Sequence, residues 1–109
     1  MAEMRRELAS ALGLCRKAGK LLLGFDAVAD AVKRDKACLL LMAKDLSPKS
    51  AGEIYRLAHN KNIKVAAIQA TMDDLWHTLG KRAGILAVTD KNLAVLTAAA
   101  LNRDEEDIN

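Results

Sequence analysis

Apolar positions along the chain follow two different spacings, which predict helices and strands in alternation. Between residues 5 and 18, Leu8, Leu12 and Cys15 recur at helical spacing, and basic residues lie off that stripe. Residues 37–43 instead form a continuous apolar run, which is typical of a central strand buried on both faces of a sheet. The whole pattern predicts helices over 5–18, 26–34 and 48–60, from residue 72 onward and over 90–101, and strands over 20–23, 37–43, 64–68 and 85–89.

Capping residues mark where several of these helices begin. Ser47 followed by Pro48 predicts the start of the third helix. Thr71 and Asp90 predict the starts of the fourth and fifth helices, and the acidic pair at 73–74 would lie in a first turn, where negative charge is favourable. The inward-facing residues of the second helix are predicted to be Ala27, Val28, Ala31 and Val32.

The regular alternation predicts an α/β fold with helices on both faces of one sheet. The length of 109 residues fits one compact domain, which we place over residues 1–103. Residues 104–109 hold four of the 14 acidic side chains and are predicted to form a polar, frayed tail.

The composition indicates an aliphatic core. Hydrophobic residues make up 51% of the chain but aromatic residues only 3%, namely Phe25, Tyr55 and Trp76. So few rings argue against a platform that stacks single-stranded nucleic acid. Cys15 and Cys38 lie far apart in apolar stretches, and no histidine cluster accompanies them. We therefore predict two buried thiols, no metal site and a reducing, cytoplasmic setting.

No motif for catalysis, nucleotide binding or membrane insertion stands out. The glycines at 13 and 19 miss the phosphate-loop spacing, and Leu21 stands where that motif needs Ser or Thr. His59 and His77 lie on different predicted helices, and no serine has the surroundings of a nucleophile. The apolar runs are too short to span a bilayer. We therefore predict a protein that is not an enzyme, uses no cofactor and does not bind membranes.

Basic charge is the remaining chemical signal. The chain carries a net charge of +3, and residues 1–103 hold 17 basic against 10 acidic side chains. This excess favours a polyanionic partner such as nucleic acid, although a solvated cationic rim would have the same composition. The basic residues that fall in predicted loops or at strand–helix junctions are Lys20, Lys44, Lys81, Arg82 and Lys91.

Three stretches resemble a known family. Residues 12–21 (Leu-Gly-Leu-Cys-Arg-Lys-Ala-Gly-Lys-Leu), 39–45 (ending Met-Ala-Lys-Asp) and 87–94 (Ala-Val-Thr-Asp-Lys-Asn-Leu-Ala) are similar to the bacterial YlxQ-like branch of the ribosomal L-seven-Ae superfamily. With residues 75–81 included, the resemblance extends over about 8–96. It implies a three-layer α/β/α sandwich around a small mixed sheet of about four strands. It also implies binding of RNA, typically at a kink-turn.

The same resemblance implies where RNA would lie. In the family, RNA is held by the start of the second helix, here from Gly24, and by the loop after the fourth helix, here 81–85. The RNA-binding branches then carry polar residues, commonly Thr-Asn-Glu. This chain has Phe25, Asp26 and Ala27 instead, so its contacts to bases would differ from those of its relatives.

Two aromatic side chains leave alternatives open. Phe25 fits either a stack on a base or packing on the domain. Trp76 stands where the family usually has glycine, and it fits a stacking surface, a partner contact or half-buried packing, the usual state of a single tryptophan. If the chain kept the fold but lost RNA binding, both side chains would serve a protein-interaction module.

Together these observations predict a non-catalytic, cytoplasmic RNA-binding protein that is associated with the ribosome and recognises structured, kink-turn-like RNA. Its expected partners are ribosomal or other structured RNA and ribosomal proteins. The predicted RNA-binding residues are Lys20, Gly24, Phe25, Asp26, Ala27, Lys44, Lys81, Arg82 and Lys91.

Overall fold

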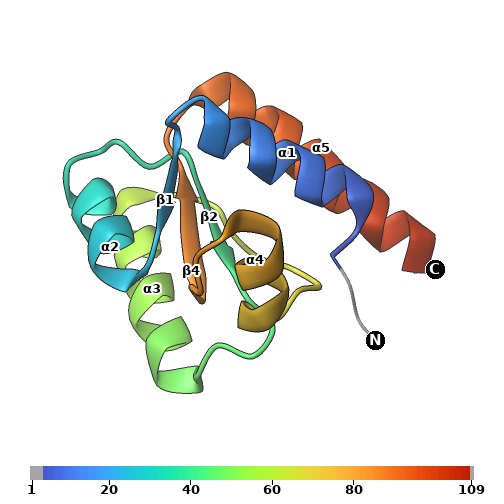
Figure 1. The fold of residues 1–109 in the computed structure, drawn as a ribbon. Coiled ribbons are helices and arrows are strands. Elements are labelled where there is room, and N and C mark those ends of the chain that lie inside the picture. The colour runs from blue at the N-terminus through green and yellow to red at the C-terminus, as the bar shows by residue number, and fades with distance from the viewer. Residues whose placement is uncertain (1–3, 109) are drawn as a thin grey trace.

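Helices and strands alternate along the chain in the computed structural model, which describes residues 4–108 and their side chains as far as residue 102 (Figure 1). The predicted order of elements is confirmed, with most boundaries shifted by one or two residues. The helices are α1 (Arg6–Lys17), α2 (Phe25–Lys33), α3 (Pro48–Lys61), α4 (Met72–Leu79) and α5 (Lys91–Ile108). The strands are β1 (Leu21–Leu23), β2 (Leu39–Met42), β3 (Val65–Ala67) and β4 (Ile85–Val88).

The predicted helix caps are confirmed by their hydrogen bonds. Ser47 Oγ accepts a bond of 3.2 Å from the backbone N–H of Ser50, at the start of α3. Thr71 and Asp74 form a reciprocal capping box at the start of α4. An Asp90 carboxylate oxygen accepts a bond of 2.9 Å from the backbone N–H of Leu93 in α5. Each cap satisfies a donor that the helix itself leaves unpaired.

The four strands form one mixed sheet in the order β1-β4-β2-β3. Strand β4 is antiparallel to both β1 and β2, whereas β3 is parallel to β2. All residues of β2 and β4 are buried, which confirms the prediction that the apolar run at 37–43 is a central strand. Its middle residue, Leu40, is fully buried.

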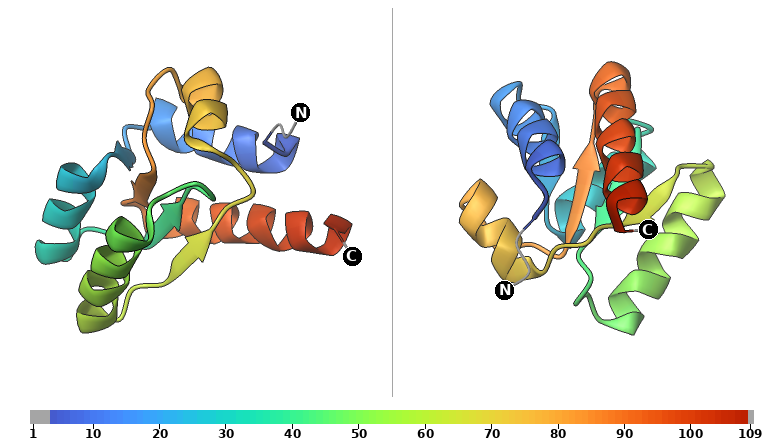
Figure 2. Two further views of the ribbon diagram at one scale, coloured as in Figure 1. Left: turned by 90° about the horizontal axis from the view of Figure 1, so that it is seen from below. Right: turned by 90° about the vertical axis from the view of Figure 1, so that its right-hand side faces the viewer.

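Helices cover both faces of this sheet and complete the predicted three layers. Helices α1, α4 and α5 pack on one face, where Leu8, Leu12 and Leu75 belong to a single apolar cluster with the inward side chains of the strands. Helices α2 and α3 pack on the other face through a second cluster that includes Val28 and Ile54. Figure 2 shows the two groups of helices on opposite sides of the sheet.

Three expectations about individual residues were wrong. Ala27 is exposed: it lies in the first turn of α2, and the buried stripe of that helix consists of Val28, Ala29, Ala31 and Val32. Cys38 is exposed because it precedes β2 at the end of the sheet. Helix α5 extends to Ile108, beyond its predicted end at residue 101, in keeping with the helix propensity of glutamate. Asn109 lies outside the described residues.

Candidate nucleic-acid interface

Strand direction divides the surface loops between two ends of the sheet. Strands β1, β2 and β3 finish at the end where β4 starts, because Leu23 pairs with Leu86 and Met42 pairs with Ile85. We call this the Gly24 end, and it comprises residues 24–27, 43–47, 68–73 and 80–84. The opposite end, which we call the Lys20 end, comprises residues 17–20, 33–38, 61–64 and 89–91.

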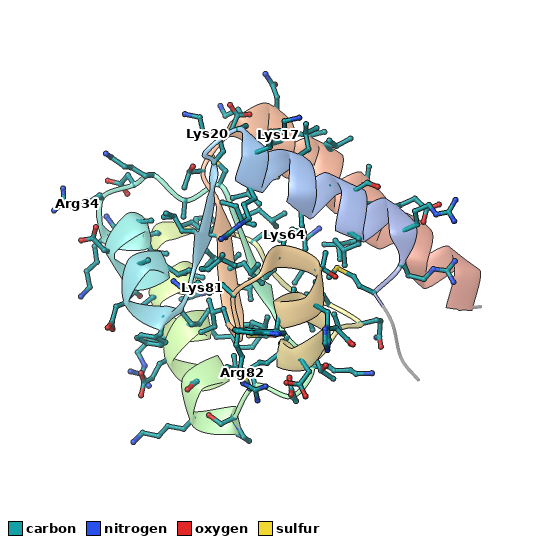
Figure 3. The ribbon with its side chains drawn as sticks, viewed as in Figure 1. Lys17, Lys20, Arg34, Lys64, Lys81 and Arg82 are labelled. Atoms are coloured by element: carbon teal, nitrogen blue, oxygen red, sulfur yellow. The ribbon has the colours of Figure 1, made fainter. Side chains whose placement is uncertain are left out.

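The predicted RNA-binding residues do not all lie together. Lys20 and Lys91 lie at the Lys20 end, and the backbone N–H of Thr89 donates a bond of 2.9 Å to the carbonyl oxygen of Lys20 there. Strand β1 separates the two ends by roughly 13 Å, at about 3.3 Å per residue. Figure 3 shows Lys20 at the upper edge of the molecule and Lys81 and Arg82 below it. The predicted residues at the Gly24 end are Gly24, Phe25, Asp26, Ala27, Lys44, Lys81 and Arg82.

Gly24 exposes the start of helix α2. Its φ of 103° and ψ of 155° belong to a region that is essentially restricted to glycine. Its backbone N–H donates to the carbonyl oxygen of Ile85 at 2.9 Å, and its own carbonyl oxygen accepts from Val28 at 3.1 Å. A Cβ atom at this position would meet nothing within 4 Å, so the backbone is open to a ligand. The first N–H groups of α2 therefore face an accessible surface, with the positive end of the helix dipole behind them.

Backbone contacts hold the loop after β2 against the loop before β4. The N–H of Ala43 donates to the carbonyl oxygen of Gly84 at 2.8 Å, and that of Lys44 donates to Ala70 at 2.9 Å. Gly84 permits this close approach, because a Cβ there would lie 2.7 Å from a methyl carbon of Leu46. Lys44 is consequently fixed on the same end of the sheet as residues 80–84.

The three cations of the Gly24 end differ in their availability. Lys44 and Lys81 are exposed, and neither has an ion-pair partner among the described residues. Arg82 instead forms an ion pair with Asp73 in the first turn of α4. Asp26 is exposed at the start of α2, so positive and negative groups alternate on this end.

The two aromatic residues near this end behave differently. Phe25 is partly buried and packs against the cluster under α2 and α3, which favours its packing role. Trp76 is 53% exposed, so about half of the side chain packs on the domain and the rest is open to a partner. It lies three residues after Asp73 on α4, on the same face of the helix, and so lies near the Asp73–Arg82 pair. The sequence signal for Trp76 was its occurrence where the family usually has glycine.

Two further findings concern other kinds of site. Among the side chains that the structure describes, no group of three or more His, Cys, Asp or Glu residues could hold a metal ion. No helix in the described part of the chain is long and apolar enough to cross a membrane.

The fold and the Gly24 end define a small α/β protein in which exposed cations lie beside an open helix N-terminus. Residues 6–97 match the model of the ribosomal protein L7Ae/L30e/S12e/Gadd45 family. The match covers most of the chain, so the protein belongs to this family.

Solved structures with the same fold include two from distant organisms. One is a protein of unknown function from Bacillus halodurans, with a TM-score of 0.84 and 22% sequence identity, covering 90% of this chain and 99% of that one. Another is the 15.5kD RNA binding protein of Giardia lamblia, with a TM-score of 0.71 and 16% identity, covering 97% of this chain and 94% of that one. At these identities the likeness establishes the fold.

Proposed function

We propose that this protein is a non-catalytic RNA-binding protein that recognises structured, kink-turn-like RNA through its Gly24 end, in the cytoplasm and on the ribosome. The observation that carries the proposal is the open backbone at Gly24, at the same end as Lys44 and Lys81. Family membership and the fold shared with the Giardia RNA binding protein support it.

Phosphate would be held mainly at the start of α2. The free N–H groups after Gly24 and the helix dipole together favour an anion. Without a Cβ at residue 24, an RNA backbone can approach these donors closely. Lys44 and Lys81 would add unpaired positive charge, and Arg82 would contribute once RNA competes with Asp73 for its guanidinium group.

Base contacts would differ from those of relatives with an Asn-Glu pair. The carboxylate of Asp26 can only accept hydrogen bonds, so it would select an exposed amino group such as the N4 amine of cytosine. The exposed indole of Trp76 offers a face on which an unstacked base can lie. The protein would thus bind a bent RNA whose bases are splayed outward.

A pair of double variants tests this site. Lys81→Ala with Arg82→Ala should weaken binding of a kink-turn RNA in fluorescence anisotropy and flatten the salt dependence by about 0.7–0.9 per lost phosphate contact. The matched control is Lys61→Ala with Lys64→Ala, which removes two cations from the Lys20 end and should leave affinity for a minimal kink-turn RNA, too short to reach that end, nearly unchanged. A larger loss in the control pair would contradict the proposed site.

Association with the ribosome needs a separate measurement. The tagged protein should co-sediment with ribosomal particles on sucrose gradients of a cell extract, and the Lys81→Ala/Arg82→Ala variant should shift to the top of the gradient. If the unmutated protein binds no structured RNA at low salt, the proposal fails. The alternative of a protein-interaction module, with Trp76 and Phe25 as contact residues, would then be favoured.

A further inference from the structure

We propose that the Lys20 end is a second RNA-binding surface, which holds the phosphate backbone of an RNA helix while the Gly24 end holds a kinked segment. The protein would then bridge two segments of RNA. This inference rests on the proposed function and adds a site at the opposite end of the sheet, built from other residues.

Uncompensated positive charge is the first observation. Four exposed lysines at this end, three from different links of the chain and one from the start of α5, have no ion-pair partner among the described residues. Three acids line a hollow at this end, of which two are paired with other cations and the third keeps its charge while it caps a helix. Asp30 pairs with Arg34 at 3.1 Å, Asp35 pairs with Lys61 at 3.0 Å, and Asp90 caps α5. The four lysines are Lys20, Lys36, Lys64 and Lys91.

Helix electrostatics does not account for these lysines. Cations in a last turn offset the negative end of a helix dipole, and this explains Lys17, Lys33 and Lys61 in α1, α2 and α3. Lys20, Lys36 and Lys64 lie in the links beyond those helices. Lys91 is the first residue of α5, where the dipole disfavours a cation. A partner with negative charge is therefore the simplest reason for this arrangement.

The lysines flank successive strands across the sheet. Lys20 precedes β1, Lys91 follows β4, and Lys36 and Lys64 precede β2 and β3, which is the order of the strands in space. Since adjacent strands lie about 4.8 Å apart, the row spans roughly 14 Å. Backbone hydrogen bonds hold the row in place. The N–H of Thr89 donates to the carbonyl oxygen of Lys20, and the N–H of Leu40 donates to the carbonyl oxygen of Lys64 at 3.0 Å. Figure 3 labels two of the four, Lys20 at the upper edge of the molecule and Lys64 nearer the centre of that view.

The shape of this end suits an RNA backbone better than a small anion. Two shallow hollows of about 650 and 530 Å³ meet here, and both are lined by Lys91 and Cys38. The first is also lined by Lys20 and Lys36, and the second by Lys64. A broad, continuous row of cations matches the regularly spaced phosphates of double-stranded RNA, which proteins bind largely through shape and backbone contacts.

Cys38 provides a native probe for the occupied surface. Its thiol is exposed within the row of lysines, whereas Cys15 is fully buried and serves as an internal reference. Double-stranded RNA without a kink-turn should slow the alkylation of Cys38 by N-ethylmaleimide, measured by mass spectrometry. Alanine at Lys20, Lys64 and Lys91 together should abolish this protection. The Lys81→Ala/Arg82→Ala variant should retain it, and thermal melts of both variants should match the unmutated protein.

A capture assay tests the bridge. An immobilised kink-turn RNA should retain a fluorescent RNA duplex only when the unmutated protein is added, and the triple lysine variant should still bind the kink-turn RNA but retain no duplex. If Cys38 reacts equally fast with and without duplex while the kink-turn RNA binds, this inference is wrong and the proposed function stands. If the duplex protects Cys38 but the kink-turn RNA does not bind, the proposed function fails and no bridge exists. Equal protection of Cys38 by polyglutamate would overturn RNA as the ligand.

Discussion

At the scale of single residues, neighbours in space decide what each side chain at the Gly24 end can do. Lys81 and Arg82 are adjacent cations in the sequence, yet only Arg82 has an acidic partner. An exposed ion pair of this kind contributes little to stability, about 0–1 kcal/mol. Its larger effect is to reduce the positive charge that the Gly24 end offers to a phosphate.

The Asp73–Arg82 pair predicts a variant that binds RNA more tightly. Asp73→Asn removes a negative charge from the Gly24 end and frees the guanidinium group of Arg82, so affinity for a kink-turn RNA should rise. The matched control is Asp30→Asn, which breaks the pair with Arg34 at the Lys20 end and should leave that affinity unchanged. Anisotropy titrations at one salt concentration make the comparison, and weaker binding by Asp73→Asn would contradict the proposed phosphate contact.

Gly24 predicts a variant with two separable effects. Gly24→Ala places a side chain where φ is 103°, so it should lower the free energy of unfolding by about 1–3 kcal/mol through backbone strain. A Cβ would meet nothing in the protein itself, so a loss of RNA affinity would come from contact with the ligand or from a strained shift of the backbone donors. Gly13→Ala, inside α1 and also with open space at Cβ, should be neutral or stabilising by up to about 1 kcal/mol. Urea denaturation gives the first effect, and unchanged stability of Gly24→Ala would refute it.

At the scale of elements, contacts between distant segments build the layers. Helices α1 and α5, at opposite ends of the chain, lie side by side (Figure 2). Between them Cys15 Sγ lies 3.6 Å from Thr97 Oγ1. The Thr97 hydroxyl donates its proton to the carbonyl oxygen of Leu93 at 2.8 Å, so the thiol must be the donor to Thr97. Cys15 is thus a neutral, buried hydrogen-bonding group in the folded protein.

The burial of Cys15 predicts a pH effect on stability. Burial, with a smaller contribution from the charge of Asp90, raises the pKa of the thiol above its usual value. As the pH rises, the thiol ionises in the unfolded chain before it ionises in the folded protein. The contribution of Cys15 to the free energy of unfolding is therefore complete below about pH 8.5, and above that it falls by at most about 1.4 kcal/mol per pH unit. Denaturation at several pH values should show this loss in the unmutated protein and in Cys38→Ala. Cys15→Ala should show a smaller dependence, and an identical one would contradict the prediction.

Strand β2 predicts the largest loss of stability. Leu40 is fully buried, and its side chain belongs to the cluster under α2 and α3. Leu40→Ala should cost about 2–5 kcal/mol, because apolar contacts are lost and a cavity remains. Leu96→Ala removes the same atoms from a side chain that is 44% exposed and should change stability by about 0.5 kcal/mol or less. If Leu40→Ala loses less stability than Leu96→Ala in urea denaturation, β2 is not a central strand.

At the scale of the whole molecule, the fold sorts charge between two ends. The starts of α2, α3 and α4 face the Gly24 end, where three cations lie among Asp26, Asp45 and Asp73. The ends of α1, α2 and α3 face the Lys20 end, which carries the larger excess of lysine. At the Gly24 end the positive ends of the helix dipoles attract phosphate, whereas at the Lys20 end the excess of lysine does so.

This charge distribution predicts how binding responds to salt. With Lys44 and Lys81 free and Arg82 shared with Asp73, the logarithm of affinity for a minimal kink-turn RNA should fall with the logarithm of salt with a slope of about 2. Longer RNA that also reaches the Lys20 end should show a steeper slope. Anisotropy over a range of potassium chloride concentrations measures both, and a flat response would refute an electrostatic mode of binding.

Much of the fold could be predicted from local patterns. Helical spacing of apolar residues, the caps at Ser47, Thr71 and Asp90, and the apolar run at 37–43 all depend on residues close in sequence. Such signals place helices, strands and the central strand. For the proposed site, local patterns indicated the basic loop residues, whereas Gly24 was implied by the family resemblance.

Which of those residues share a surface was decided by the tertiary structure. No local pattern shows that β4 runs antiparallel to its neighbours, yet this pairing brings Gly24 and Gly84 to one end of the sheet and sends Lys20 and Lys91 to the other. The pairing of Arg82 with Asp73 and the exposure of Cys38 likewise depend on segments that meet only in the folded chain. The physical reason is that the apolar pattern specifies which residues are buried, whereas charge acts through distance in space.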